Sequence, residues 1–310
     1  MQKKLLPITL HTLRILLGAS FLFSGFVKLY PIEPFEFNFV DQGFANWYTA
    51  PFMARFIISF EFLLGLLLVL NYNLKRFTLK ATIGLLIFFT LYLIFGIIKD
   101  GNTGNCGCFG TFLKMTPLES IIKNIFLLSI AFTLYFLHND YDWKYKKAVF
   151  ISSLLVSLAT PMILNPIDLF MSRNQQTEKV GYKIDLDMLY NNPKYSPPTV
   201  DLREGKQIVA FFSVTCKHCR IGAFKLGILK KQHPNMPVHV ILMGDTAYLK
   251  SYYRETKSEM LPISFYNDEK IFKVIGPGVP VVFVLDNGIV KSKMFGLIRD
   301  DDKELNALLD

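Results

Sequence analysis

The sequence contains very little cysteine. There are four cysteines in 310 residues, and they form two close pairs, Cys106/Cys108 and Cys216/Cys219. No single thiol is left over. Two close pairs without a spare cysteine suggest that the protein carries out thiol–disulfide exchange between them.

The chain also lacks two features that would indicate other classes of protein. Its net charge of +9 is not gathered into a basic stripe, so the sequence predicts no nucleic-acid partner. The apolar run at its start, residues 8–30, contains Arg14 and is not followed by a convincing small-residue cleavage site. We therefore expect an uncleaved first membrane helix there and not a secretory signal peptide.

Apolar residues, in contrast, are abundant and unevenly spread. They make up 51% of the chain and include 29 phenylalanines, which is high for a soluble protein. They gather in five runs, residues 8–30, 54–70, 77–98, 118–137 and 148–164. A helix needs about 20 mostly apolar residues to span the hydrocarbon core. The sequence thus predicts an α-helical transmembrane bundle of about five helices, of which the second and fifth are the shortest.

The positive charges between these runs predict the orientation, because Lys and Arg are enriched in cytoplasmic loops. One side carries eight of them and the other four: Lys3, Lys4, Lys75, Arg76, Lys80, Lys144, Lys146 and Lys147 against Lys28, Arg55, Lys99 and Lys114. The first side is expected in the cytoplasm. With five helices, both cysteine pairs face outward; with four, they would face opposite sides.

After about residue 170 the pattern is typical of a soluble α/β domain. We assign residues 1–170 to the membrane domain, 171–184 to a linker and 185–310 to the soluble domain. Strands are expected at residues 207–214, 238–243 and 263–266, and helices at 216–231, 246–256 and 301–309. Residues 268–273 predict a helical turn. The dipeptide Asn287-Gly288 predicts a hairpin between strands at 281–285 and 289–295.

Cys216 and Cys219 are expected to begin a helix that follows a strand. The positive end of the helix favours the thiolate of the first cysteine, and the neighbouring Lys217 and a protonated His218 would add to this effect. The pattern indicates redox chemistry, with Cys216 as the attacking and Cys219 as the resolving thiol. Half of a zinc site is the alternative, but no second pair of ligand-like spacing follows downstream.

Residues 185–310 resemble the thioredoxin fold, in particular its extracytoplasmic thiol–disulfide oxidoreductases. The resemblance rests on the sequence FFSVTCKHC at residues 211–219 and on Gly278-Val279-Pro280 before a strand. It implies a cis peptide bond between Val279 and Pro280 beside the cysteine pair, and therefore Pro280 as a site residue. The chain departs from the common pattern at Thr215, where the family has Trp, and at Lys217, where it has Gly or Pro. These departures leave the redox potential open.

The first half resembles the MauE/DoxX-like membrane proteins over residues 8–137. LRILLG at residues 13–18, SGFVKL at 24–29, Glu61 with Gly65, and CGCFG at 106–110 carry the resemblance, and the last points to MauE. It implies a four-helix membrane core involved in disulfide formation or electron transfer during the maturation of exported proteins. Membrane partners of this type often exchange electrons with quinone, so the resemblance makes quinone a candidate cofactor.

A disulfide between Cys106 and Cys108 would close a small, strained ring, which Gly107 permits. Strain raises the reduction potential, so such a bond is expected to be labile and not structural. Two alternatives remain: a structural disulfide, and binding of a soft metal such as Cu(I) by the dithiol in a delivery protein. Apart from this alternative, we predict no resident metal.

Ionisable groups inside membrane segments are functional candidates. Glu61 and Arg14 are therefore candidates for a charge or proton-transfer role, with a structural ion pair between them as the alternative. Lys28 is expected to reach the membrane surface and to need no special role. The aromatic segment at residues 31–53 is interpreted as an interfacial belt, with a lid over the cysteine site as the alternative.

We conclude from the sequence that the protein is a multi-pass protein of the bacterial cytoplasmic membrane and an enzyme, a protein thiol–disulfide oxidoreductase. Electrons would pass between Cys106/Cys108 and Cys216/Cys219 on the outer face. Its expected partners are the thiols or disulfides of exported proteins, membrane lipid and quinone. Copper handling by the same cysteines is the alternative, and a membrane assembly factor with incidental cysteines is a third hypothesis.

Overall fold

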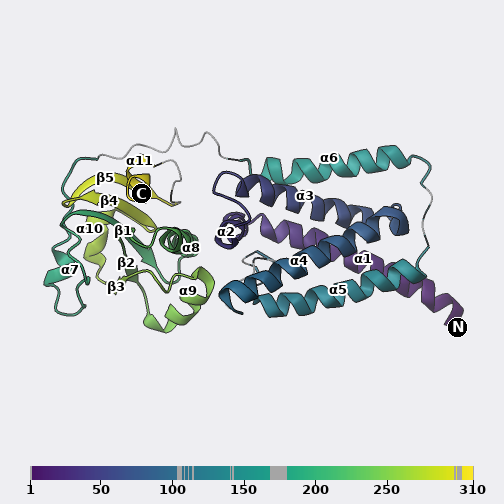
Figure 1. Cartoon of the computed structure of the whole chain (residues 1–310), viewed down its shortest axis with the longest axis horizontal. Helices are drawn as coiled ribbons and strands as arrows, with labels where there is room; N and C mark the ends of the chain where they lie inside the picture. Colours follow the sequence, from purple (N-terminus) through teal and green to yellow (C-terminus); the bar gives the residue numbers. More distant parts are fainter. Residues whose placement is uncertain are drawn as a thin grey trace. The chain divides into compact units, whose positions relative to one another are not determined.

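The structure is a computed structural model that describes residues 2–102, 107, 109–110, 112–113, 115–139, 141, 143–167, 180–296, 298 and 302–309. Cys106 and Cys108 lie outside the described residues. The chain forms two compact units, residues 1–167 and 168–310 (Figure 1). Each unit is described by itself below.

The first unit contains the five predicted membrane helices. They are α1 (Gln2–Lys28), α3 (Ala50–Val69), α4 (Leu79–Asp100), α5 (Pro117–Leu137) and α6 (Lys146–Leu164). All five are long and apolar enough to cross a membrane. A short helix, α2 (Glu33–Gln42), lies between α1 and α3, and a π-helical turn, η1 (Leu74–Thr78), precedes α4. The expected bundle is confirmed.

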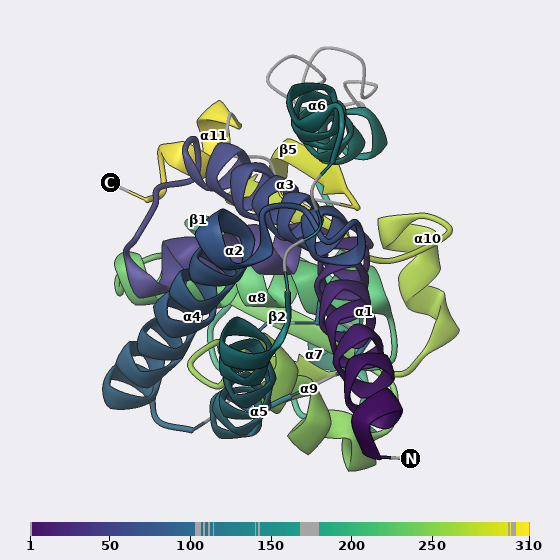
Figure 2. The same cartoon turned by 90° about the vertical axis from the view of Figure 1, so that its right-hand side faces the viewer.

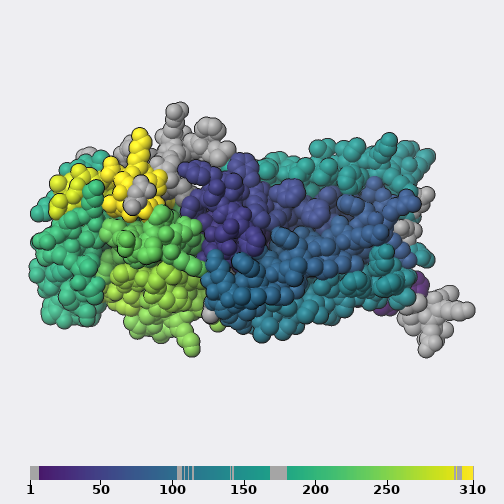
Figure 3. All heavy atoms as spheres, in the orientation of Figure 1, coloured from purple at the N-terminus to yellow at the C-terminus, as the bar shows by residue number. Residues whose placement is uncertain are grey.

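Four of these helices form the core of the unit. α1 packs against α3 and α5, and α4 packs against α5, whereas α6 packs on the outside of α3 (Figure 2). The outer faces of the bundle carry apolar side chains that are largely exposed, as a lipid-facing surface requires. On α4 and α5, which form the blue surface in Figure 3, they include Leu91, Ile98, Ile122 and Phe126.

The helices α1 and α3 approach each other closely where two glycines meet. A Cβ atom added to Gly18 would lie 2.9 Å from the carbonyl oxygen of Gly65 and 2.8 Å from a methyl group of Val69. A Cβ atom added to Gly65 would lie 3.0 Å from the carbonyl oxygen of Gly18. Small residues at such crossings allow membrane helices to pack backbone against backbone.

One end of the bundle holds α2, and we call it the α2 end. The last residues of α6 also lie here, because the Arg55 side chain binds the carbonyl oxygen of Asn165 at 2.8 Å. Asn165 in turn donates a hydrogen bond to the carbonyl oxygen of Leu29, just after α1. Arg55 also forms a buried ion pair with Glu36 of α2, at 2.6 Å. These contacts fix where the chain leaves the membrane unit.

The second unit is built on a five-stranded sheet with the strand order β3-β2-β1-β4-β5. The strands are β1 (Lys206–Ser213), β2 (Val238–Met243), β3 (Ile263–Phe265), β4 (Val281–Asp286) and β5 (Ile289–Phe295). β1, β2 and β3 are mutually parallel, while β4 is antiparallel to β1 and to β5. The helices include α7 (Met188–Asn191), α8 (Lys217–Gln232), α9 (Leu249–Thr256), α10 (Phe272–Ile275) and α11 (Lys303–Asn306). The predicted order of elements is confirmed, with bounds shifted by a few residues.

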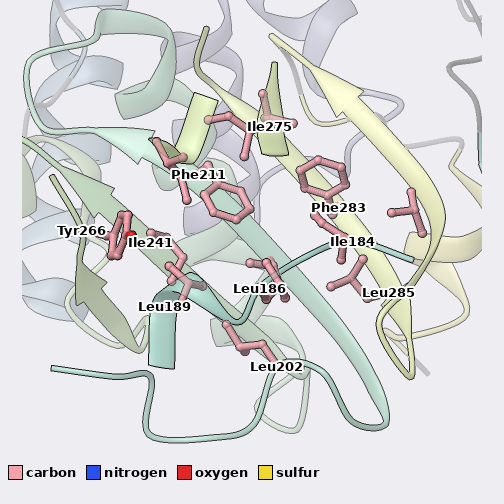
Figure 4. Packing of buried hydrophobic residues seen from close by; sticks show 14 of the residues in the cluster. Ile184, Leu186, Leu189, Leu202, Phe211, Ile241, Tyr266, Ile275, Phe283 and Leu285 are labelled. Carbon is pink, nitrogen blue, oxygen red and sulfur yellow. The ribbon is translucent and has the colours of Figure 1, made fainter. Parts of the chain in front are cut away.

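A hydrophobic core covers one face of this sheet (Figure 4). Its central side chains come from β1, β2 and β4, and further ones come from the segment before β1: Phe211, Ile241, Phe283 and Leu285, with Ile184, Leu186 and Leu189. Ile184 is buried, and its backbone N–H donates a hydrogen bond to the carbonyl oxygen of Gly288. Residues 180–184, which we assigned to the linker, therefore pack on the hairpin as part of the soluble unit.

The hairpin turn has the predicted conformation. Asn287 and Gly288 have φ values of 50° and 74°. Positive φ at both central residues is the requirement of the tight turn that matches the twist of the two strands. The turn places β5 at the edge of the sheet and holds β4, whose first residue follows Pro280, beside β1.

Candidate functional site

The soluble unit places Cys216 and Cys219 in the first turn of α8, directly after β1. Cys216 is the N-cap residue of the helix, and its sulfur accepts a hydrogen bond from the backbone N–H of Cys219 at 3.3 Å. Cys216 is partly exposed, whereas Cys219 is completely buried. Both are free thiols in this structure. One accessible and one buried thiol is the arrangement that allows the first to meet a substrate and the second to resolve it.

The peptide bond between Val279 and Pro280 is cis, as the resemblance implied. The thiol of Cys216 lies 3.9 Å from the carbonyl oxygen of Val279. The loop before β4 therefore forms one wall of the site, beside the exposed sulfur. This wall brings backbone groups close to whatever binds Cys216.

Burial raises the pKa of the Cys219 thiol, and the hydrogen bond and charge of the Cys216 sulfur raise it further. The thiol is therefore held protonated when Cys216 is free. Only a thiolate attacks a disulfide efficiently. Backbone hydrogen bonds at Ser213 and Cys219 act in the opposite direction and favour the Cys219 anion, so they lower its pKa in part.

Arg220 ties this first turn of α8 to its surroundings. Its guanidinium group donates hydrogen bonds to the carbonyl oxygen of Val214, at 2.9 and 2.7 Å, and lies 2.5 Å from the carboxylate of Glu255 on α9. Nothing in the sequence pattern singles out this pair. The sequence shows only that a charged residue, Arg220, follows Cys219. Its partner Glu255 is distant in the chain and could not be inferred.

In the membrane unit, the described residues next to Cys106 and Cys108 lie at the α2 end. Gly107, which the sequence places between Cys106 and Cys108, is buried with φ of 71°, and a Cβ atom there would lie 2.7 Å from the amide nitrogen of Asn38 on α2. Gly110 has φ of 56°, and a Cβ atom there would collide with the carbonyl oxygen of Val27. Only glycine fits both positions, because other residues rarely adopt positive φ and the side chain has no room.

The structure corrects our interpretation of the membrane charges. Glu61 forms its ion pair with Lys28 and not with Arg14. The Lys28 ammonium group lies 2.8 Å from both carboxylate oxygens of Glu61 and donates a hydrogen bond to the hydroxyl of Ser24 at 2.6 Å. Lys28 is only 2% exposed, so it does not reach the membrane surface. The Glu61 carboxylate on α3 holds the Lys28 ammonium group inside the bundle.

Arg14 binds elsewhere. Its guanidinium group donates hydrogen bonds to the carbonyl oxygens of Leu68 and Val69, the latter at 2.6 Å. These are among the last carbonyl groups of α3, which have no partner within the helix. A cation at the negative end of a helix is favourable. Arg14 therefore holds the end of α3 against α1.

A small cavity adjoins the Lys28–Glu61 pair. Its volume is about 30 Å³, which accommodates water but not an aromatic ring. Its polar lining comes from Ser20, Ser24, Lys28, Glu61, Lys123 and Asn124. Phe109, the residue after Cys108, also lines it, and the Lys123 ammonium group lies 4.3 Å from the centre of its ring. The cavity thus connects the buried ion pair with the segment that carries the membrane cysteines.

Comparison with known proteins agrees with this division. Residues 6–137 match the model of the family described as Methylamine utilisation protein MauE. The first unit is a multi-pass membrane domain of the MauE type. Protein TlpB of Flavobacterium psychrophilum is 28% identical over 296 residues, which cover 80% of this chain and 80% of that protein. The similarity to TlpB therefore extends well beyond the MauE-type domain.

The soluble unit has a thioredoxin-like fold, by its strand order, its cysteine-bearing helix and its cis-proline. Solved structures similar to it include the thioredoxin domain of a thiol-disulfide oxidoreductase from Bacteroides vulgatus. That domain is 18% identical, with a TM-score of 0.30, and the match covers 43% of this chain and 96% of that one. A thioredoxin family thiol:disulfide interchange protein from Chlorobium tepidum is 19% identical, with a TM-score of 0.29, covering 34% and 81%.

Proposed function

We propose that the protein is a membrane-bound thiol–disulfide oxidoreductase that acts on exported proteins. The observation that carries this proposal is the geometry of the Cys216 pair: an accessible sulfur at a helix N-terminus, a buried second thiol, and a cis-proline loop beside them. A helix N-terminus stabilises a thiolate, and an adjacent thiol resolves a mixed disulfide.

The reaction with a substrate disulfide has two steps. The Cys216 thiolate attacks one substrate sulfur, which forms a mixed disulfide and releases the other substrate sulfur as a thiolate that takes up a proton. The Cys219 thiolate then attacks the Cys216 sulfur, which forms the Cys216–Cys219 disulfide and releases the second substrate thiol. The substrate gains two electrons and two protons, and the cysteine pair loses them. Run in reverse, the same steps oxidise a substrate dithiol.

We further propose that the Cys216 pair exchanges with Cys106/Cys108. Two observations support this relay. Gly107 and Gly110 lie at the α2 end of the membrane unit, and Arg55 holds Asn165, at the exit of the chain toward the soluble unit, at the same end. Residues 168–179 then span at most about 40 Å when extended. Such a short connection keeps the soluble unit at a high effective concentration near that end.

The distribution of Lys and Arg residues among the loops supports an outward position for the α2 end. The α2 end would then face the periplasm or cell exterior, where exported proteins acquire their disulfides. Reporter fusions after residue 167 and within residues 71–73 test this orientation. An active periplasmic reporter at the second position would contradict it.

The membrane pair needs a further two-electron partner in a complete cycle, and we propose a membrane quinone for this role. A quinone dissolved in the bilayer accepts two electrons and two protons from a dithiol, which becomes a disulfide. We propose that Glu61 moves these protons, and its position at the cavity that Phe109 also lines supports this role. Reduced protein mixed with a short-chain quinone should lose the two Cys106/Cys108 thiols, and Glu61→Gln should slow this loss.

A trapping experiment tests the relay. In the Cys108→Ser, Cys219→Ser double variant, each pair keeps one cysteine, so exchange stops at a Cys106–Cys216 bond. We expect this bond in the purified full chain without reductant, by mass spectrometry of peptides. The matched control, Cys108→Ser with Cys216→Ser, should give much less crosslink because Cys219 is buried. Absence of the bond under oxidising and reducing conditions alike would contradict the relay.

Metal analysis of the anaerobically purified protein tests the alternative. Stoichiometric copper that is lost on Cys106→Ser would favour metal delivery instead.

A further inference from the structure

The start of α8 carries basic residues where a helix usually carries acidic ones. Lys217, His218 and Arg220 all lie there, and the first turn contains no acidic residue. Cations are unfavourable at a helix N-terminus, because that end already carries partial positive charge. Lys217 and His218 are exposed to water, whereas the side chain of Arg220 is only 16% exposed. A largely buried cation at this end of a helix needs a reason in the surrounding structure.

The guanidinium group of Arg220 holds the segment between β1 and α8. Its Nε and Nη2 atoms both donate hydrogen bonds to the carbonyl oxygen of Val214, at 2.9 and 2.7 Å. Val214 is completely buried, and its backbone N–H donates to the carbonyl oxygen of Met243 on β2 at 2.9 Å. Buried backbone groups need such partners. Val214 is therefore fixed from two sides, by β2 and by Arg220.

Two residues of α9 orient this guanidinium group. The Nη1 atom of Arg220 lies 2.5 Å from the carboxylate of Glu255, whose side chain is only 14% exposed. The Nη2 atom lies 3.5 Å from the hydroxyl of Ser251, one turn earlier. A guanidinium group is planar and its N–H groups have fixed directions. A contact at Nη1 therefore also fixes the direction in which Nε and Nη2 point.

The held segment leads directly to the reactive sulfur. Val214 lies two residues before Cys216, whose carbonyl oxygen accepts a hydrogen bond from the backbone N–H of Arg220 at 3.1 Å. Arg220 thus binds the chain on both sides of the Cys216 side chain. In this arrangement the Cys216 sulfur accepts a hydrogen bond from the backbone N–H of Cys219 at 3.3 Å. A shift of the segment would move one sulfur relative to the other, and disulfide formation has strict geometric requirements.

We propose that Arg220, oriented by Glu255, is a positioning residue that holds Cys216 in the geometry from which it exchanges with Cys219. The inference rests on the proposed function and deepens it. When the mixed disulfide is resolved, the Cys219 thiolate attacks the Cys216 sulfur and the substrate sulfur leaves with the bonding electrons. The proton of Cys219 goes to solvent, and the leaving thiolate takes one up. Arg220 and Glu255 exchange neither protons nor electrons.

The test uses the full chain with Cys106→Ser and Cys108→Ser, so that only the Cys216 pair reacts. The reduced protein is mixed with oxidised glutathione, and the release of glutathione from the mixed disulfide is followed over time. Arg220→Lys keeps the charge, but an ammonium group cannot reproduce the fork that binds Val214 and Glu255 together. We expect this variant to slow release about tenfold or more, as misplaced reacting groups do.

Variants of Glu255 separate geometry from charge. Glu255→Gln removes the charge but keeps an oxygen that can accept from Nη1 of Arg220, so it should release glutathione at nearly the parent rate. Glu255→Ala removes the contact and should slow release in the same direction as Arg220→Lys. The opposite pattern, a normal rate for Arg220→Lys and a slow one for Glu255→Gln, would show that charge acts here and would overturn the proposal.

A merely structural role is tested by a variant that is destabilised elsewhere. Val290 is completely buried in β5, two strands from β1, so Val290→Ala should lower the unfolding midpoint without changing glutathione release from the folded protein. The equilibrium constant for oxidation of the Cys216 pair by glutathione should change in Arg220→Lys and not in Val290→Ala. Equal effects of these two variants would overturn the proposal. If the parent forms no mixed disulfide at Cys216, the proposed function fails instead.

Discussion

The ammonium group of Lys28 lies 2.8 Å from both carboxylate oxygens of Glu61, and both side chains are at most 5% exposed. They connect α1 and α3 inside the MauE-type domain. Neither charge is solvated by water at this buried position. Removing one of them therefore leaves the other buried without compensation, which destabilises the fold.

We therefore expect Glu61→Leu to destabilise the membrane domain by about 3–5 kcal/mol, because it leaves Lys28 buried and without its counter-ion. The double variant Lys28→Leu, Glu61→Leu should recover most of this loss. The thermal unfolding midpoint in detergent measures both. If the double variant were as unstable as the single one, the pair would not be the source of the effect.

The close crossing of α1 and α3 predicts a difference between two glycines. Gly18→Ala should destabilise the domain by about 1–3 kcal/mol, the usual cost of overpacking, because the new methyl group meets Gly65 and Val69. Gly84→Ala on α4 is the matched control, since nothing lies within 4 Å of its added Cβ atom. The Gly84 variant should be at least as stable as the parent. Equal effects of the two changes in a thermal unfolding assay would refute the crossing.

The two thiols of the soluble unit should differ in reactivity. Burial raises the pKa of Cys219, whereas Cys216 is partly exposed. In reduced protein with Cys106→Ser and Cys108→Ser, a maleimide at neutral pH should modify Cys216 at least tenfold faster than Cys219. Mass spectrometry of single variants that keep one of the two cysteines measures this. Comparable rates in the folded protein would contradict the assignment of attacking and resolving thiols.

His239 predicts a loss of stability in mild acid. It is completely buried in β2, and burial lowers its pKa from 6.5 to about 4. Between these two values the unfolded chain binds a proton that the folded chain does not. Stability therefore falls as the pH is lowered from 6.5 toward 4, by about 3 kcal/mol in total.

Pulse proteolysis of the full chain in urea, read at the soluble unit, checks this dependence at pH 7.5 and pH 5. His239→Gln should show a smaller loss between the two pH values. The control is His233→Gln, near the end of α8, where the side chain is only partly buried and the parent's pH dependence should persist. A parent protein equally stable at both pH values would refute the argument.

Much of the fold could be predicted because its signals are local. The five apolar runs, the Asn287-Gly288 turn and the strand before Cys216 each follow from short stretches of sequence. The cis-proline followed from a family resemblance, and the structure confirms it. The linker was less accurate. Residues 180–184 follow a polar stretch and were assigned with it, but Ile184 packs into the core of the sheet.

The pairing of the membrane charges could not be predicted from position along the helices. Arg14 and Lys28 both lie on α1. Which of them pairs with Glu61 depends on which side chain faces α3 at the depth of Glu61 in the bundle. Lys28 lies near a helix end, where long side chains usually reach the surface. Here Ser24, one turn earlier, and Glu61 bind it inside the bundle instead.

The outlying position of α6 has a consequence for how such a protein could arise. α6 packs chiefly on α3, where its Ser153, Ser157 and Pro161 are buried, and its Phe150 also contacts Tyr72 and Phe77 before α4. The helices α1, α3, α4 and α5 contact one another without it. A core with an even number of spans returns its chain to the starting side of the bilayer. One added helix reverses the side from which the polypeptide emerges. One added helix is therefore enough to let a four-helix membrane domain carry a soluble domain on the side of the bilayer opposite to its N-terminus.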